Sequence, residues 1–219
     1  MNYFTSNRVT QQECSTPRYK IPVSAFTACF WMKTDDETNE GTPLSYSTTS
    51  TSNELLVHNY QNFLLCINDD ERDTTVAAAG GRWHHICATW ENNAGSWQLF
   101  KDGVLKKMAK ILKRHNILSV PVDPCEKIHL AELCHSWWTV GGGVLVLSEE
   151  QDEPGSRFDS LQSFRGKMTG VHLWDFVLHH HDVNLFNTCQ TGRGNVLAWS
   201  HFIDAQRGDG VTVTAMLPC

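Results

Sequence analysis

The feature of this sequence that most constrains its fold is a series of short apolar segments separated by polar turns. The clearest segment is AFTACFWMKT at residues 25–34. In an extended strand, Phe26 and Phe30 fall on one face and Cys29 on the other, so both faces are apolar. A strand that is apolar on both faces is typical of the interior of a packed sandwich.

Similar segments follow at short spacing. They are GTPLSYS (41–47), NELLVHNY (53–60), FLLCIND (63–69), RWHHICATWEN (82–92), SWQLFKDG (96–103), VLVLSEEQD (144–152), GKMTGVHLWDFVL (166–178) and NVLAWSHF (195–202). The Asp-Gly pair that ends one of them predicts a hairpin turn. A single short helix is predicted at HHHDVNLFNTC (179–189). Many short strands predict an all-β fold, namely a two-sheet antiparallel sandwich or jelly roll with one short helix.

Composition excludes several classes of protein. Of 219 residues, 41% are hydrophobic and 19% are charged, which favours a folded domain with a sizeable core. The net charge of −6 and the scattered basic residues argue against nucleic-acid binding. No run of roughly 18 apolar residues occurs, so we expect no direct membrane insertion. The N-terminus lacks the apolar stretch of a signal peptide, so if the protein is extracellular or secreted, we interpret this chain as a fragment of it.

One segment differs in composition from its surroundings. Within residues 104–139, KKMAKILKRHN is basic and weakly helical, and VPVDPCEKIHLAELCHSWW carries two cysteines. We interpret residues 106–139, approximately, as an insertion on the surface of a single domain that spans residues 1–219. Loops tolerate such insertions at a small entropic cost.

The cysteine pattern indicates an oxidising compartment. The eight cysteines are widely separated, unlike a paired C-x-x-C zinc framework; they are Cys14, Cys29, Cys66, Cys87, Cys125, Cys134, Cys189 and Cys219. An even number in a strand-rich chain favours disulfides over free thiols. The alternative, a cytosolic protein with eight buried thiols, is disfavoured because Cys219 is the terminal residue. The residues alone leave the pairing open.

Several motifs, in order along the chain, resemble the pentraxin family. The family motif H-x-C-x-S/T-W-x-S/T is matched by His85, Cys87, Thr89 and Trp90, with Asn92 in its last position. The block VLVLSEEQDEPGSRFDSLQSFRG resembles the calcium loop of the family. The resemblance runs from about Phe26 to Cys219 and is closest to neuronal pentraxins and to pentraxin-like domains of adhesion receptors. It implies a jelly roll of the laminin-G or concanavalin type, two calcium ions, and assembly into a homo-oligomer of the pentamer type.

The resemblance also implies a set of calcium ligands. Carried over position by position, they are Asn53, Glu150, Gln151 (through its backbone carbonyl), Asp152, Asp159 and Gln162. Calcium takes six to eight oxygen ligands, and crowded carboxylates repel one another without a cation. Ser52 stands where the family often has aspartate, so we expect one of two ions to bind more weakly. The alternative interpretation is an acidic, solvated hairpin loop.

Two disulfides follow from the same resemblance. The family bridge corresponds to Cys29–Cys87, and an additional pair in the neuronal subgroup corresponds to Cys189–Cys219. No counterpart is assigned to the other four cysteines, although Cys125 and Cys134 can bridge locally within the insertion.

We therefore predict an extracellular, calcium-dependent recognition domain without catalysis, whose partner is a cell-surface or extracellular ligand. One alternative is the pentraxin-like ectodomain of an adhesion G-protein-coupled receptor. A remote alternative is a jelly-roll glycoside hydrolase, which needs a third acid after Glu150 and Asp152 on the same strand face. The position of that third acid falls on Pro154 or Gly155, which argues against catalysis.

Overall fold

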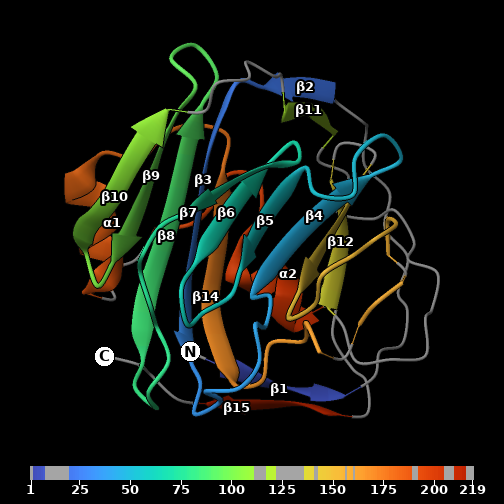
Figure 1. Ribbon diagram of the computed structural model, residues 1–219, viewed down its shortest axis with the longest axis vertical. Coiled ribbons are helices and arrows are strands. Elements are labelled where there is room, and N and C mark those ends of the chain that lie inside the picture. Colours follow the sequence, from blue (N-terminus) through green and yellow to red (C-terminus); the bar gives the residue numbers. More distant parts are fainter. Residues whose placement is uncertain are drawn as a thin grey trace.

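The strands form two large antiparallel sheets, packed face to face, and one small two-stranded pair (Figure 1). The computed structural model describes residues 2–7, 20–110, 117–121, 136–140, 143–155, 157–159, 161–188, 192–204 and 210–215. No helix in these residues is long and apolar enough to cross a membrane. The predicted fold class, an all-β two-sheet sandwich, is confirmed.

The first sheet has seven strands. In spatial order they are β10 (Val104–Lys110), β9 (Ser96–Lys101), β8 (His84–Glu91), β3 (Ala25–Lys33), β14 (Lys167–Trp174), β1 (Asn2–Asn7) and β15 (Gly210–Ala215). The predicted Asp-Gly hairpin joins β9 to β10. Asp102 and Gly103 have φ of 54° and 74°, the left-handed backbone that this kind of turn requires.

The second sheet has six strands. In order they are β12 (Ser136–Val140), β13 (Gly143–Leu147), β4 (Leu44–Thr48), β5 (Leu55–His58), β6 (Leu64–Ile67) and β7 (Asp70–Asp73). The small pair joins β11 (Ile117–Pro121) to β2 (Lys20–Val23). Of the eight segments that follow AFTACFWMKT in the sequence, seven contain a strand, as predicted. They include the segments that form β4, β5 and β6 of the second sheet.

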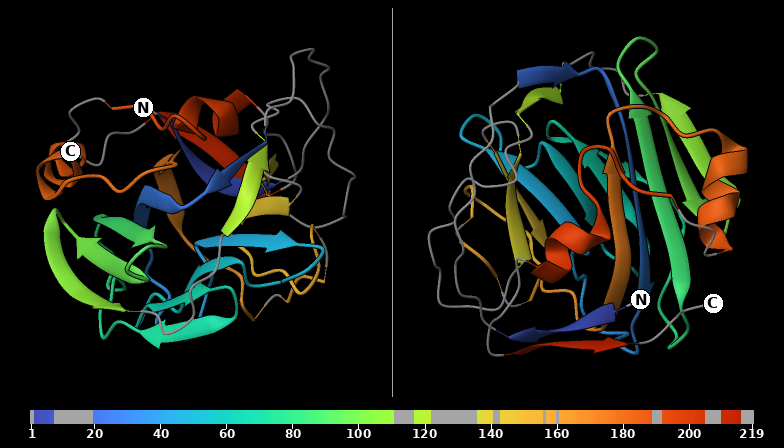
Figure 2. Two further views of the ribbon diagram at one scale, coloured as in Figure 1. Left: turned by 90° about the horizontal axis from the view of Figure 1, so that it is seen from above. Right: turned by 180° about the vertical axis from the view of Figure 1, so that it is seen from behind.

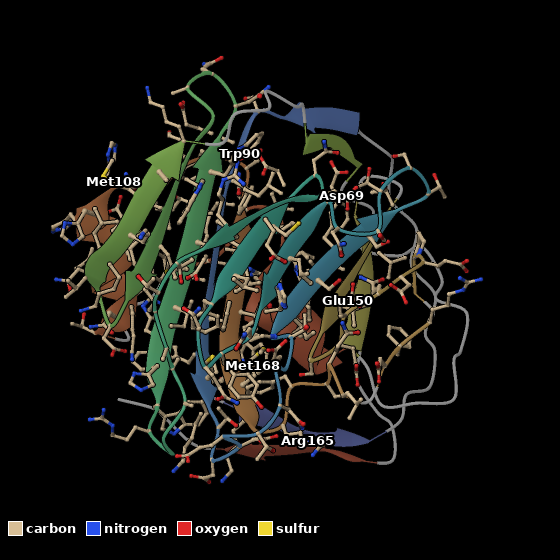
Figure 3. The ribbon with its side chains drawn as sticks, viewed as in Figure 1. Asp69, Trp90, Met108, Glu150, Arg165 and Met168 are labelled. Atoms are coloured by element: carbon tan, nitrogen blue, oxygen red, sulfur yellow. A yellow bond between two sulfur atoms is a disulfide. The ribbon has the colours of Figure 1, made fainter. Side chains whose placement is uncertain are left out.

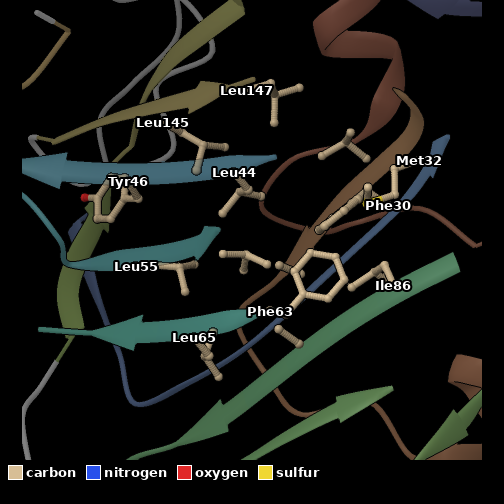
Figure 4. Packing of buried hydrophobic residues seen from close by; sticks show 14 of the residues in the cluster. Phe30, Met32, Leu44, Tyr46, Leu55, Phe63, Leu65, Ile86, Leu145 and Leu147 are labelled. Atoms are coloured by element: carbon tan, nitrogen blue, oxygen red, sulfur yellow. The ribbon is translucent and has the colours of Figure 1, made fainter. Parts of the chain in front are cut away.

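The core lies between the two sheets, where alternate residues of facing strands interdigitate. Phe30 and Ile86 come from the seven-stranded sheet, and Leu44, Leu55 and Leu145 come from the six-stranded sheet (Figure 4). Because side chains alternate along a strand, their neighbours in sequence must point to the outer faces. The other segments of the chain are positioned by the outer face that each of them covers.

Two short helices complete the fold. Helix α1 (His180–Asn187) matches the predicted helix and lies against the outer face of the seven-stranded sheet (Figure 2). It buries Val183 over the Cys29–Cys87 bridge, beside Phe100 and Trp174. Helix α2 (Trp199–Asp204) contacts β14.

The strand predicted at residues 195–202 is wrong. Only Leu197 forms a bridge, to Leu173, and α2 begins at Trp199. Val196, Trp199 and Phe202 are all buried in the core and are spaced three residues apart, which is a helical period. The run VLAW obscured that period because a short apolar run is consistent with either structure.

The basic segment after the hairpin is extended where the structure describes it. Lys106–Lys110 belongs to β10, so the prediction of weak helix is wrong for these residues. Edge strands rich in lysine are common because the charges oppose further strand pairing. Residues 111–116 and 122–135 lie outside the described part of the chain, and the insertion stays a prediction.

Candidate calcium site

The candidate site is built on the outer face of the six-stranded sheet. Leu44 and Tyr46 point into the core, so Ser45 and Ser47 of the same strand point outward. Both serines nevertheless have no exposed surface. A segment of chain must therefore cover this face of β4.

Gln151 provides that cover. Its side-chain Nε2 donates to the carbonyl oxygen of Ser45 at 3.2 Å, to Ser45 Oγ at 3.2 Å and to the carbonyl oxygen of Val144 at 3.0 Å. Its Oε1 accepts from the backbone N–H of Gly155 at 2.8 Å. The carboxamide is thus fully used in fixing the loop to β4 and β13. The ligand role predicted for Gln151 involves only its backbone carbonyl, and it stays a prediction.

Three predicted carboxylate ligands lie close enough to influence one another. Glu150 is 6% exposed, and burial raises the pKa of its carboxyl. The neighbouring charges of Asp152 and Asp159 raise that pKa further. Both aspartates are exposed. A cation among these groups would remove the repulsion that favours the protonated form of Glu150.

Glu149, which was not among the predicted ligands, joins the two ends of the loop. Its Oε1 accepts a hydrogen bond from Ser163 Oγ. Burial raises the pKa of Glu149 to about 7, with smaller contributions from Asp159 and Glu150 in the same direction. Ser163 Oγ and Arg165 act in the opposite direction. No local sequence signal predicts this contact, because it joins residues 14 positions apart.

Backbone hydrogen bonds close the loop at its base. The N–H of Phe164 donates to the Ser148 carbonyl at 2.8 Å, and the N–H of Thr42 donates to the Gln162 carbonyl at 2.8 Å. The N–H of Gln162 donates to the Asp159 carbonyl at 2.9 Å. The backbone of Gln162 is therefore fixed beside that of Asp159.

Asn53 reaches the same sheet from the connection between β4 and β5. Its Oδ1 is buried and accepts no hydrogen bond from any residue that the structure describes. A buried amide oxygen without a partner is costly, and a cation is one group that satisfies it. Within the described residues, Asn53 makes no direct hydrogen bond to Glu150 or Asp152. The structure therefore brings the loop carboxylates near one another but shows no contact between them and Asn53.

The predicted Cys29–Cys87 disulfide is present, between directly paired residues of β3 and β8. His85 lies within 4.8 Å of both sulfurs, but cysteines joined to each other do not form a metal site. The predicted Cys189–Cys219 pair lies outside the described residues, as do Cys14, Cys125 and Cys134. Cys66 is a buried free thiol on the outer face that carries Gln151.

Comparisons with known proteins agree with the sequence motifs. Residues 3–214 match the model of the "Pentaxin family". The chain is 32% identical over 179 residues to human neuronal pentraxin-2, covering 80% of this chain and 36% of that protein. It is 34% identical over 189 residues to the rat "Sushi, von Willebrand factor type A, EGF and pentraxin domain-containing protein 1", covering 84% of this chain and 5% of that protein.

Two solved structures share the fold. One is a native heptameric SAP-like pentraxin from Limulus polyphemus, with a TM-score of 0.70 and 22% identity, covering 97% of this chain and 94% of that chain. The other is the full extracellular region of zebrafish Gpr126/Adgrg6, with a TM-score of 0.64 and 17% identity, covering 100% of this chain and 26% of that chain. The chain thus spans only part of these curated relatives, 36% of human neuronal pentraxin-2 and 5% of the rat protein.

Proposed function

This chain belongs to the pentraxin family, and from that premise we propose that it is an extracellular recognition domain whose ligand binds through calcium on the outer face of the six-stranded sheet. The observation that carries the proposal is the buried Asn53 Oδ1, which has no hydrogen-bond partner among the described residues of a sheet whose covering loop is rich in carboxylates. Asp152 and Asp159 are exposed, as they would be in an acidic, solvated loop, whereas Glu150 is buried.

The residues that would hold calcium supply different kinds of oxygen. Glu150, Asp152 and Asp159 supply carboxylates, Asn53 and Gln162 supply amide oxygens, and Gln151 supplies its carbonyl. The bound ion presents positive charge to an anionic group of the ligand. Because Ser52 offers no carboxylate, we expect one of two ions to bind weakly, in the range of Kd about 10⁻⁴–10⁻³ M that is usual for extracellular calcium modules.

A thermal melt in calcium and in chelator tests the proposal. An ion present at ten times its Kd stabilises the folded chain by about 1.4 kcal/mol, which is roughly 3–6 °C for a domain of this size. We expect the parent to show this shift and Asp152→Asn to show much less of it. Glu37→Gln is the matched control, since this exposed acid lies in the connection between β3 and β4 and should leave the shift unchanged.

Calorimetric titration of calcium into metal-free protein provides the second measurement. Equal melts in calcium and chelator, together with no heat of binding, would contradict the proposal and leave an adhesion domain that works without calcium.

The assembly and the setting of the domain are part of the same proposal. The Limulus structure is a heptamer, so we propose a cyclic homo-oligomer for this chain, to be measured by light scattering coupled to gel filtration. The fold also occurs in the extracellular region of a receptor, which supports the second candidate, a receptor ectodomain that senses a ligand. A monomer at micromolar concentration would favour this second candidate.

We propose no catalytic activity. Glycoside hydrolases need two carboxyl groups in defined positions across a scissile bond. Here Glu150 is buried, and the chain turns at Pro154 and Gly155, where a third acid would have to stand. Gly155 adopts φ of 69°, which is unlike an extended strand.

A further inference from the structure

The turn between β6 and β7 brings an aspartate next to Asn53. The turn residues Asn68 and Asp69 both have a left-handed backbone, with φ of 50° and 60°. The N–H of Asn68 donates to the Glu54 carbonyl at 3.0 Å, and the N–H of Asp69 donates to the Asn53 carbonyl at 3.1 Å. Two backbone hydrogen bonds therefore fix Asp69 against Asn53.

The turn accepts an aspartate at this position but does not require its charge, since Gly, Asn and Asp all suit a positive φ. Two-residue turns of this kind favour Asn followed by Gly, because both residues need positive φ. Asp69 is exposed, and its carboxylate makes no hydrogen bond or ion pair with any residue that the structure describes. Its neighbours differ in this respect, because Asp70 pairs with Arg72 and Glu71 with His58.

A second contact to the backbone of Asn53 comes from strand β6. The thiol of Cys66 donates to the Asn53 carbonyl at 3.8 Å, so it lies directly beside this residue. The backbone N–H of Asp69 and the thiol of Cys66 therefore both meet the backbone carbonyl of Asn53, whose side-chain Oδ1 is buried without a partner among the described residues.

Cys66, which contacts Asn53, lies on the same outer face of the sheet as Gln151. Ser45, which Gln151 contacts, is paired with Leu56, and Leu56 is paired with Cys66. Cross-strand partners share a face, so Gln151 and Cys66 lie on one outer surface, two strand spacings or about 10 Å apart. Figure 3 shows Glu150 and Asp69 near different strands of this sheet.

We infer that Asp69 is a calcium ligand of this chain, supplying from the β6–β7 turn the carboxylate that Ser52 does not provide beside Asn53. This inference rests on the proposed function, because it assigns a further ligand to the same site. The carboxylate of Asp69 restores one negative charge beside Asn53, so we expect calcium to bind more tightly than the loss of an acid at Ser52 alone predicts.

Calcium titration calorimetry on the metal-free chain tests the inference through the dissociation constant. Asp69→Asn keeps the preference for a left-handed turn and removes only the charge, and we expect about a tenfold rise in Kd. Asp69→Gly suits the turn equally well and should give the same loss. Glu71→Gln is the control: it removes one charge from the same hairpin, but from a side chain directed at His58, and should change Kd less than threefold.

Asp152→Asn separates the two hypotheses. If the parent binds no calcium by calorimetry, the proposed function fails and the inference fails with it. If Asp152→Asn weakens binding but neither Asp69 variant exceeds the effect of Glu71→Gln, the proposed function stands and the role of Asp69 is overturned. Melting of each variant in chelator, within a few degrees of the parent, confirms that the fold is intact.

Discussion

The two sheets of this sandwich cover their outer faces in opposite ways. Helix α1 covers the seven-stranded sheet with apolar side chains over the Cys29–Cys87 bridge. The loop after β13 covers the six-stranded sheet with a hydrogen-bonded amide, Gln151, and with buried carboxyl groups. The first cover is complete in the chain alone, because apolar packing and a covalent bond need no further partner. The second leaves carboxyl groups close together, and in the proposed function a cation neutralises their charge.

We infer from this difference that the two faces have separate roles. The disulfide face should determine how stable the domain is, and it should do so equally with and without calcium. The loop face should determine what the domain binds, and its contribution to stability should depend on the ion. Four predictions test this division, beginning with the largest expected effect.

Removing the disulfide should cost the most. The double variant Cys29→Ala/Cys87→Ala opens a loop defined by a sequence separation of 58. The chain-entropy model gives a loss of about 4 kcal/mol, which corresponds to roughly 8–16 °C in melting temperature. We expect the same loss in calcium and in chelator.

Cys66→Ala is the matched control, since it removes a buried thiol from the other face and breaks no covalent bond. A disulfide loss that differs by several degrees between calcium and chelator would show that the two faces are coupled, contrary to the division proposed above.

Gln151→Glu should have the next largest effect, and on the loop face. The substitution keeps the shape of the side chain but replaces a donor with an acceptor, opposite the carbonyl oxygens of Ser45 and Val144. Unsatisfied buried groups and a repelled charge should cost about 3 kcal/mol. We also expect the calcium-dependent rise in melting temperature to disappear.

The control for this variant is Gln98→Glu, the same change at a half-buried position of β9. It should cost less than about 1 kcal/mol, as is usual away from buried networks, and leave the calcium shift intact. Equal melts for the parent and Gln151→Glu would contradict the role assigned to this amide.

The third prediction uses acid to weaken the disulfide face. Burial is the main cause that lowers the pKa of His85 and His172 to about 4 each, with Asp102 opposing the shift at His85. Arg193 and His201 lower the pKa of His172 further. Because both folded values lie below the unfolded value of 6.5, stability is complete above pH 6.5 and falls as the pH approaches 4.

Between pH 7.5 and pH 5, each histidine should account for a loss of about 2 kcal/mol. His172 Nδ1 accepts from the N–H groups of Gly194 and Trp199, and the side-chain oxygen of Asn can accept in its place. We expect His172→Asn to halve the acid loss, measured by urea unfolding in chelator. An unchanged loss would mean that groups elsewhere, such as the loop carboxyls, dominate the pH dependence.

The sequence predicted some of these features and could not predict others. Alternation in AFTACFWMKT predicted β3, and Asp102-Gly103 predicted the hairpin, because both signals are local. Helix α2 was missed because its apolar residues fit two periods. The resemblance named Gln151 as a ligand, but its hydrogen bonds to Ser45 span 106 residues, and no local pattern reports such a contact.

The smallest expected effect concerns strain where the loop leaves β13. Ser148 has φ of 75°, a conformation that costs an L-residue about 1–2 kcal/mol and glycine almost nothing. Glycine also loses more backbone entropy on folding, by about 0.5–1 kcal/mol, so Ser148→Gly should stabilise the chain by only about 0.5–1 kcal/mol. Ser96→Gly, in the extended strand β9, should change stability in the opposite direction.

The backbone bonds of Ser148 to Pro43 and Phe164 stay in place, so the loop keeps its geometry and the calcium Kd should change less than threefold. If Kd instead rises tenfold while the fold becomes more stable, the strained serine contributes to ion binding, and stability and binding on this face are less separable than the comparison of the two faces implies.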